Sequence, residues 1–287
     1  MVTEYISPTS VKEVLGILKE RKGEARIIAG GTDLILDLKE ETREVKYLVD
    51  ITGIEELGRI EPDGDSISIG AAVSHQQVVS SALIQERAPV LVEAALSIGS
   101  PQIRNQGTVV GNVVNAQPAA DAAVALLALE AQAEVVTRNG KRLMPLEELY
   151  QGIGVSAVDS TAEIVTTLHF KGLADNQGSA FMRLAQRKAL ALPMLNVAVV
   201  ITVQDGCFQD VRLVLAPVAP MPFRARKAEA ALQGAAIGSA VINQAAEIAA
   251  SEAQPRDSDL RGSAEYRREM VKVLVRRALE QAVRNAQ

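Results

Sequence analysis

The segment from residue 107 to residue 121 carries side chains and backbone suited to binding a phosphorylated ligand. Gly107 and Gly111 lie close together in it, and glycine lets a ligand approach the main-chain N–H groups. Thr108 and Asn112 add a hydroxyl and an amide that both donate and accept hydrogen bonds. The segment therefore predicts a binding site for a phosphate-bearing cofactor. The alternative is purely structural: a turn that needs glycine and leads into a core helix explains the same residues.

An apolar, alanine-rich run closes this segment and predicts a helix over residues 119–129. Pro118 is placed to open that helix, because proline is favoured at the first helical position. The free N–H groups and the dipole at a helix start favour an anion. Asp121 lies in this helix start, where its carboxylate can accept hydrogen bonds.

A second glycine-rich segment, Gly30-Gly31-Thr32-Asp33, lies near the N-terminus. It follows a short apolar strand predicted over residues 25–29. A strand followed by two glycines, Thr and Asp at a helix start presents backbone N–H groups to a pyrophosphate. A tight turn whose Asp or Thr caps the helix accounts for these residues as well.

The composition restricts the class of protein. The 287 residues are 48% hydrophobic, which is sufficient for two or three small packed domains, and no apolar run approaches a membrane span. No basic and apolar leader opens the sequence, so we expect a cytoplasmic protein without membrane insertion. The net charge of −5 and the scattered lysines and arginines give no reason to expect nucleic acid.

The count of metal-binding residues is lower than most metal centres need. Cys207 is the only cysteine, and His75 and His169 are the only histidines. The usual iron–sulfur ligand sets need four cysteines, or two with two histidines, and a zinc site is similarly implausible. Any metal chemistry that this protein serves must therefore be on another chain. The sequence also lacks the glycine fingerprint of simple dinucleotide-binding dehydrogenases.

The hydrophobic pattern predicts an α+β fold. Antiparallel strand pairs are expected around the turn signals Arg138-Asn139-Gly140, read as a type I′ turn, and Asp205-Gly206. Helices are expected over residues 74–83, 89–98 and 263–285, with a loop over residues 99–106. We place the unit boundaries so that the three parts of the chain are residues 1–54, 55–172 and 173–287.

Several of these segments resemble one protein family. Thr-Val-Val-Gly-Asn at residues 108–112, with Asn-Ala-Gln-Pro-Ala-Ala-Asp at 115–121, looks like the second flavin motif of the FAD subunits of molybdenum hydroxylases. Ala-Gly-Gly-Thr-Asp-Leu at residues 29–34 looks like the first flavin motif. Residues 220–225 and 258–267 resemble the family's C-terminal domain, so the resemblance to the medium subunits of xanthine dehydrogenase and carbon monoxide dehydrogenase covers nearly the full chain.

The resemblance implies a fold, a cofactor and partners. The expected fold is a two-part FAD-binding domain of the PCMH/vanillyl-alcohol-oxidase-like type, followed by a C-terminal domain of antiparallel strands and helices. The expected cofactor is FAD. Electrons from a molybdenum cofactor would pass through iron–sulfur clusters, both on partner subunits, to the flavin and then to NAD or another acceptor. The complex would be heteromeric.

The resemblance also implies roles for individual residues. Residues from Ile27 to Leu34 would wrap the pyrophosphate and ribityl region; they are Ile27, Ile28, Ala29, Gly30, Gly31, Thr32, Asp33 and Leu34. The opposite wall would be Thr108, Gly111 and Asn112. Asp121 would bind cofactor hydroxyls, Val165 would pack against the isoalloxazine, and Arg183 would supply a cation beside the flavin. An ordinary surface arginine on an edge strand explains Arg183 equally well.

Two other functions are compatible with the residues. The chain could be a stand-alone FAD-dependent oxidoreductase, although no obvious acid or base accompanies the glycine segments. It could also be a scaffold subunit that has lost FAD, which the intact glycine segments argue against. The loop over residues 152–157 departs from the Gly-Pro-Gly pattern usual in the family, so we assign it no function.

Overall fold

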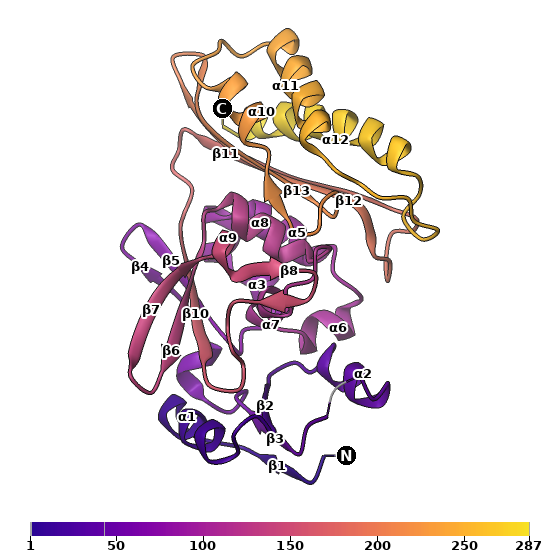
Figure 1. The fold of residues 1–287 in the computed structure, drawn as a ribbon. Coiled ribbons are helices and arrows are strands. Elements are labelled where there is room, and N and C mark those ends of the chain that lie inside the picture. The colour runs from indigo at the N-terminus through magenta and orange to yellow at the C-terminus, as the bar shows by residue number, and fades with distance from the viewer. Residues whose placement is uncertain (1, 43, 287) are drawn as a thin grey trace.

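A computed structural model describes residues 2–42 and 44–286 of the chain. Figure 1 shows the chain rising from the N-terminal strands at one end to a long C-terminal helix at the other. The described residues form a parallel sheet of three strands, an antiparallel sheet of five strands, an antiparallel sheet of four strands and a small two-stranded hairpin. The mixture of separate antiparallel sheets and helices is the α+β class that the hydrophobic pattern predicts.

The N-terminal part is a small parallel sheet with strand order β1-β3-β2. Ser10 caps the first helix, because its side chain accepts a hydrogen bond from the backbone N–H of Glu13. The turn after β2 contains the first glycine segment, so the topology puts that segment at the C-terminal end of a parallel strand. The elements are β1 (Glu4–Ile6), α1 (Val11–Glu20), β2 (Ala25–Ile28), α2 (Leu34–Lys39) and β3 (Tyr47–Asp50).

The middle part consists of the five-stranded sheet, in the order β4-β5-β10-β6-β7, and a group of short helices. β10 lies at the centre of this sheet and carries a bulge between Val165 and Thr167. The strands are β4 (Ile60–Asp63), β5 (Ser66–Gly70), β6 (Gln132–Thr137), β7 (Gly140–Pro145), β8 (Tyr150–Gly152), β9 (Val155–Ser156) and β10 (Ile164–Lys171). The helices are η1 (Glu55–Gly58), α3 (His75–Ser80), α4 (Ala82–Arg87), α5 (Pro89–Leu96), α6 (Pro101–Gln106), α7 (Val109–Val114), α8 (Asp121–Ala128) and α9 (Leu146–Leu149).

Three local predictions in this part were wrong, and one predicted helix forms with different bounds. The helix expected over 74–83 is two helices, since Ser81 ends α3 and caps α4. The loop expected over 99–106 contains α6, whose start is fixed by the Ser100 cap and by proline at its first position. The helix expected over 119–129 is shorter and begins at Asp121. A type I′ turn needs two central residues with positive φ, and neither Arg138 nor Asn139 has one, although the hairpin forms.

The C-terminal part is the four-stranded sheet, in the order β11-β12-β13-β14, covered on one face by the last helices. The predicted turn at Asp205-Gly206 is confirmed: both residues have positive φ, at 51° and 73°, and they join β12 to β13. The elements are β11 (Gln177–Ala185), β12 (Pro193–Gln204), β13 (Cys207–Ala216), β14 (Phe223–Arg224), α10 (Arg226–Leu232), α11 (Ser239–Glu252) and α12 (Ala264–Asn285).

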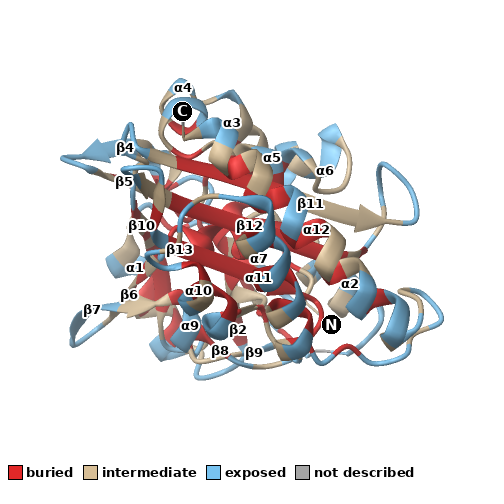
Figure 2. Cartoon of the chain, turned by 90° about the horizontal axis from the view of Figure 1, so that it is seen from above, coloured by how far each residue is buried: buried red, intermediate tan, exposed pale blue. Residues whose placement is uncertain are grey.

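The four-stranded sheet is buried on both faces, and Figure 2 shows buried residues along its central strands β12 and β13. Along β12, Val197, Val199 and Ile201 pack in the core shared with α11 and α12. The alternate residues Ala198 and Val200 pack in the core of the middle part, which contains α5 and α8. Since successive side chains of a strand point to opposite faces, β12 is the wall between the two cores.

A buried ion pair holds β13 and β14 to α10. Glu229 accepts a hydrogen bond of 2.8 Å from the backbone N–H of Leu213 and two more from the Arg224 guanidinium, at 2.8 and 3.0 Å. The side chains of Glu229 and Arg224 are each only 8% exposed. Removing Glu229 would leave the buried Arg224 with only the exposed Glu130 as its ionic partner and the N–H of Leu213 without its acceptor.

We therefore predict that Glu229→Ala lowers the free energy of unfolding by about 3–5 kcal/mol. The control is Glu247→Ala, because Glu247 forms an exposed ion pair with Lys272 at 3.0 Å, and its loss should cost less than about 1 kcal/mol. Urea denaturation of the full chain measures both. Equal effects for the two variants would contradict the importance assigned to the buried pair.

Candidate functional site

The two glycine segments are in direct contact. A Cβ atom at Gly30 would lie 2.2 Å from the carbonyl oxygen of Gln106 and 2.7 Å from the Cα of Gly107, so no side chain fits there. The carbonyl of Gly107 in turn accepts a hydrogen bond of 3.0 Å from the backbone N–H of His75. Segments that are distant in the sequence therefore form one site, with the turn after β2 pressed against the junction of α6 and α7.

The first glycine segment has backbone N–H groups that make no hydrogen bond to the described residues. Among the residues that the structure describes, none accepts a hydrogen bond from the backbone N–H groups of residues 30–34. Gly31 has a φ of +68°, a conformation that glycine tolerates and that turns the chain sharply before α2. A run of free N–H groups in a tight turn is the arrangement that binds phosphate oxygens.

The side chains of this segment do not make the capping hydrogen bonds of the simple turn that the sequence also allows. Asp33 precedes α2, yet its carboxylate makes no capping hydrogen bond. Its nearest side-chain contact is the hydroxyl of Thr32, at a long 3.5 Å. Partial desolvation raises the pKa of Asp33, and the nearby charge of Asp37 raises it further. The carboxylate is therefore available to hydroxyl donors of a ligand.

The apolar residues predicted for the site lie at the end of β2, at the start of α2 and on β10. Ile27 and Ile28 lie on β2, and Ala29 follows them. Ile27 and Ala29 are half-buried and pack against the main core, whereas Ile28 and Leu34 belong to a small separate apolar cluster. Val165 is buried on β10, next to the bulge in that strand. Residues 27–29 and Leu34 therefore flank the turn with apolar side chains.

The second glycine segment forms the start of helix α7, whereas the sequence analysis expected a helix only behind it, over residues 119–129. Thr108 caps α7 by accepting a 3.1 Å hydrogen bond from the backbone N–H of Gly111. A Cβ at Gly111 would lie 2.8 Å from the Thr108 hydroxyl, so glycine is needed for this cap. Asn112 lies one residue further on, and its Oδ1 is buried with no hydrogen-bond partner among the described residues. A buried acceptor without a partner is unusual and indicates a missing ligand or water.

Asp121 and Arg183 form an ion pair between the middle and C-terminal parts of the chain. Asp121 is 7% exposed at the start of α8, and its Oδ1 accepts a 2.9 Å hydrogen bond from the Nε of Arg183 on β11. A second donor is the Nδ2 of Asn196 on β12, at 3.0 Å. Burial raises the pKa of Asp121, and the Arg183 charge opposes that rise. The surface-arginine interpretation of Arg183 is wrong, because its side chain is only 11% exposed although β11 is an edge strand.

His75 is a residue of this site that the sequence prediction missed. It is the first residue of α3, is 3% exposed, and lies beside Gly107, and its Nδ1 has no partner among the described residues. Desolvation by burial lowers the pKa of His75 to about 4, with a contribution from the charge of Arg104. The imidazole is therefore neutral at pH 7. The capping box of Ser74 and Gln77 marks this helix start, and that spacing was the available signal in the sequence.

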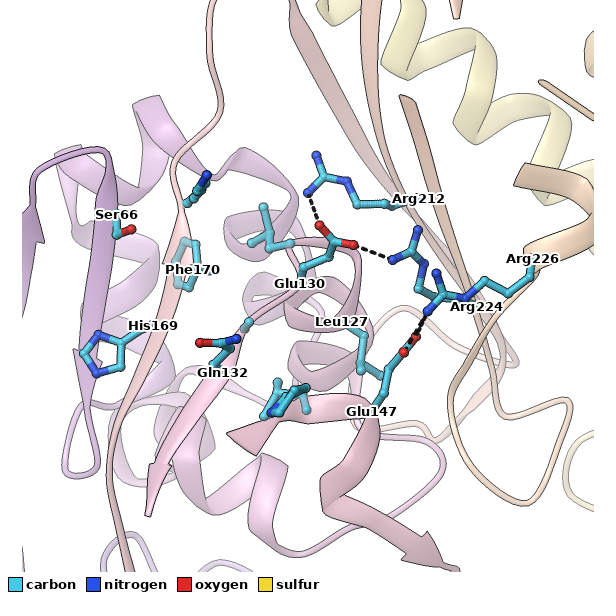
Figure 3. A pocket seen from close by; sticks show the side chains of 15 residues that line it. Ser66, Leu127, Glu130, Gln132, Glu147, His169, Phe170, Arg212, Arg224 and Arg226 are labelled. Atoms are coloured by element: carbon cyan, nitrogen blue, oxygen red, sulfur yellow. Dashed lines mark hydrogen bonds and ion pairs between the residues drawn. The ribbon is translucent and has the colours of Figure 1, made fainter. Parts of the chain in front are cut away.

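A separate cavity of about 520 Å³ lies between the five-stranded sheet and the C-terminal part (Figure 3). None of the residues predicted for the site line it. Three arginines point into it from the C-terminal part, but each is paired: Arg212 and Arg224 with Glu130, and Arg226 with Glu147. We interpret these ion pairs as contacts that join the two parts, because their charges compensate one another.

The described residues offer no alternative centre of metal chemistry. No group of three or more His, Cys, Asp or Glu side chains in this part of the chain is arranged to hold a metal ion. Within residues 2–42 and 44–286, no helix combines the length and the apolar character needed to cross a membrane. The junction of the two glycine segments is therefore the candidate functional site.

Comparison with known families identifies both main parts of the chain. A model of the FAD-binding domain in molybdopterin dehydrogenases matches residues 1–170, and one of the carbon monoxide dehydrogenase flavoprotein C-terminal domain matches residues 180–282. The chain belongs to the FAD-binding medium subunits of the molybdenum hydroxylase family. It is an FAD-binding subunit of the oxidoreductase type, and the predicted resemblance, fold class and FAD cofactor are confirmed.

Individual relatives are similar over nearly the whole chain. The carbon monoxide dehydrogenase medium chain of Hydrogenophaga pseudoflava is 31% identical over 279 residues, covering 97% of this chain and 96% of the relative. A putative xanthine dehydrogenase FAD-binding subunit of Escherichia coli is 29% identical, covering 97% and 95%. The structure is similar to a chain of Hydrogenophaga pseudoflava carbon monoxide dehydrogenase, with a TM-score of 0.94, 32% identity and coverage of 99% and 98%. A chain of quinoline 2-oxidoreductase from Pseudomonas putida gives a TM-score of 0.92 at 25% identity.

The residues at the junction fit FAD. The free N–H groups of residues 30–34 suit the negative oxygens of a pyrophosphate. The exclusion of any side chain at Gly30 keeps the two glycine segments in contact. The unpartnered Oδ1 of Asn112 and the uncapped carboxylate of Asp33 are acceptors for cofactor hydroxyls or amide groups.

The burial of His75 predicts a dependence of stability on pH. Because the folded-state pKa is about 4 and the usual value is 6.5, the unfolded chain binds more protons between these pH values. Stability contributed by neutral His75 is full above pH 6.5 and falls as the pH drops toward 4, by about 3 kcal/mol in total. A His75→Gln variant should show a shallower loss of unfolding free energy than the wild type when urea denaturation is repeated at pH 7, 5.5 and 4.5. Parallel pH curves would show that His75 is not buried as a neutral group.

Proposed function

We propose that this chain carries FAD as the electron-transfer subunit of a molybdenum hydroxylase complex and passes electrons from iron–sulfur clusters on a partner subunit to NAD or another acceptor. FAD supplies the redox chemistry when bound, since it accepts and releases electrons that no side chain of this chain can carry. The contact between Gly30 and the backbone of residues 106–107 is the observation that supports this proposal most strongly. It creates one binding surface from two flavin-type segments.

The proposal assigns a role to each part of the site. Residues 27–34 would wrap the pyrophosphate and ribityl region, with their free backbone N–H groups as donors. Thr108, Gly111 and Asn112 would form the opposite wall, in which Thr108 fixes the helix start and Asn112 offers an acceptor. Val165 would pack against the isoalloxazine ring, and Arg183 would place a cation beside it.

The proposal also covers the role of Asp121 and the boundaries of the domains. Asp121 would act at the cofactor hydroxyls or through Arg183, to which its Oδ1 is already bound. We propose residues 1–54 and 55–172 as the two parts of the FAD-binding domain and residues 173–287 as the C-terminal domain. The FAD site then lies between the first two parts, with Arg183 contributed by the third.

The proposed partner subunits follow from the small number of metal-binding residues in this chain. With one cysteine and two histidines, the chain has too few ligands for an iron–sulfur cluster of the usual kinds. We propose an iron–sulfur subunit and a molybdenum-cofactor subunit as its partners. The names of the relatives, which include medium chains and FAD-binding subunits, support such a division of labour. The organic substrate would be selected on the molybdenum subunit.

We predict that the full chain binds FAD at least about ten-fold more tightly than FMN, because FMN lacks the second phosphate and the adenosine that the turn would hold. Gly30→Ala should abolish tight FAD binding, since the new Cβ would force the two glycine segments apart. Fluorescence titration with each flavin measures the dissociation constants.

The control for this experiment is Gly53→Ala. A Cβ at Gly53 has no heavy atom within 4 Å, so this variant should bind FAD like the wild type. Equal affinity for FAD and FMN would show that the turn does not bind the pyrophosphate. A wild-type chain that binds neither flavin would contradict the proposed function and support a scaffold role.

A further inference from the structure

Asn196 is a polar residue in an otherwise apolar stretch of β12. It is 0% exposed, and its neighbours on both sides, Leu195 and Val197, belong to the C-terminal core. Alternation along the strand puts Asn196 on the opposite face, with Ala198 and Val200, toward the middle part of the chain. A buried amide in such a place costs free energy unless its hydrogen bonds are made. Its position therefore calls for a role.

The amide of Asn196 has a fixed orientation. Its Nδ2 donates to the Oδ1 of Asp121 at 3.0 Å, and its Oδ1 has no partner among the described residues. Rotating the amide by half a turn would bring its oxygen against the carboxylate oxygen, which is repulsive. Asn196 therefore helps to hold the carboxylate of Asp121 in one place, together with the side chain of Ser97.

Asp121 in turn holds the guanidinium of Arg183. The same Oδ1 accepts the 2.9 Å hydrogen bond from the Arg183 Nε. On its other side the guanidinium is fixed by a hydrogen bond from Nη2 to the carbonyl of Ala191. The remaining nitrogen, Nη1, has no partner among the residues that the structure describes. A guanidinium held at two of its nitrogens presents the third in a defined direction.

The three residues come from three elements that meet at the boundary between the two cores. Arg183 and Asn196 are directly opposite each other in the pairing of β11 with β12, and Asp121 is the first residue of α8. The side chains are almost completely buried, so this pairing is weakly screened by solvent. The direction of the Arg183 Nη1 donor therefore depends on the amide of Asn196, through Asp121. Asn196 is distant in sequence from both glycine segments.

We propose that Asn196 is a positioning residue for the flavin: with Asp121 it fixes the guanidinium of Arg183 so that the free Nη1 donates a hydrogen bond to the bound cofactor. This inference rests on the proposed FAD function. A cation held in this way stabilises negative charge that develops on the flavin ring, so it raises the affinity for FAD and its midpoint potential. Asn196 acts only through Arg183.

The test is a double-mutant cycle in the full chain with FAD as the ligand. Arg183→Met and Asn196→Leu should each weaken FAD binding about ten-fold, because each removes or misplaces one charge-assisted hydrogen bond. The double variant should bind no more weakly than Arg183→Met alone, since Asn196 has no separate effect. Both single variants should also lower the midpoint potential of bound FAD by about 30 mV, which corresponds to a ten-fold change for two electrons.

The matched control is Ser179→Ala on β11. Ser179 is buried in the same sheet and its hydroxyl has no partner among the described residues, so its removal should leave FAD affinity and potential unchanged. Asn196→Ser is the milder second variant if Asn196→Leu fails to fold. Arg183→Lys should restore part of the potential, because it keeps the charge but loses the fork geometry.

The results separate this inference from the proposed function. Additive losses in the double variant would overturn the positioning role, because Asn196 would then act independently of Arg183. An unchanged midpoint potential in Arg183→Met would also overturn it. If the wild-type chain binds no FAD, the proposed function fails; if the wild type binds FAD and the Asn196 variants bind it equally well, only this inference fails.

Discussion

The close contact between Gly30 and the backbone of Gln106 and Gly107 is the constraint on which the rest of the site depends. At 2.2 Å from the nearest oxygen, the position of a Cβ atom is already filled, so the turn after β2 can approach α6 only because residue 30 is glycine. The hydrogen bond from His75 to the carbonyl of Gly107 fixes the other side of this contact. The backbone N–H groups of residues 30–34 have no acceptor among the described residues, and we propose that they bind the pyrophosphate.

The second constraint is a set of ion pairs between the parts of the chain, of which the pair of Asp121 and Arg183 is buried. Asp121 reaches from α8 to Arg183 and Asn196 on the C-terminal sheet, and Glu130 reaches from the end of the same helix to Arg212 and Arg224. Both ends of α8 are therefore joined to the C-terminal sheet by ion pairs. Because removing one partner of a buried pair is costly, the Asp121–Arg183 pair makes the orientation of the C-terminal part specific, whereas the pairs of the exposed Glu130 contribute less.

Part of this site could be predicted from the sequence because local chemistry determines it. The glycine segments, the turn at Asp205-Gly206 and the family resemblance all depend on residue types in short stretches, and the structure places the two glycine segments side by side. The contacts of Arg183, Asn196 and His75 could not be predicted, since their partners are distant in the sequence. Burial decides the state of these side chains, and burial is a property of the assembled cores. The residue roles toward FAD remain predictions.

Amide hydrogen exchange with and without FAD tests the central claim most directly, because it reports on the backbone N–H groups themselves. In the free chain the amides of residues 30–34 have no acceptor among the described residues and should exchange rapidly. With FAD bound, the account predicts that exchange slows at these five amides. If FAD binds and these amides still exchange at the rate of the free chain, the pyrophosphate lies elsewhere and the account is wrong.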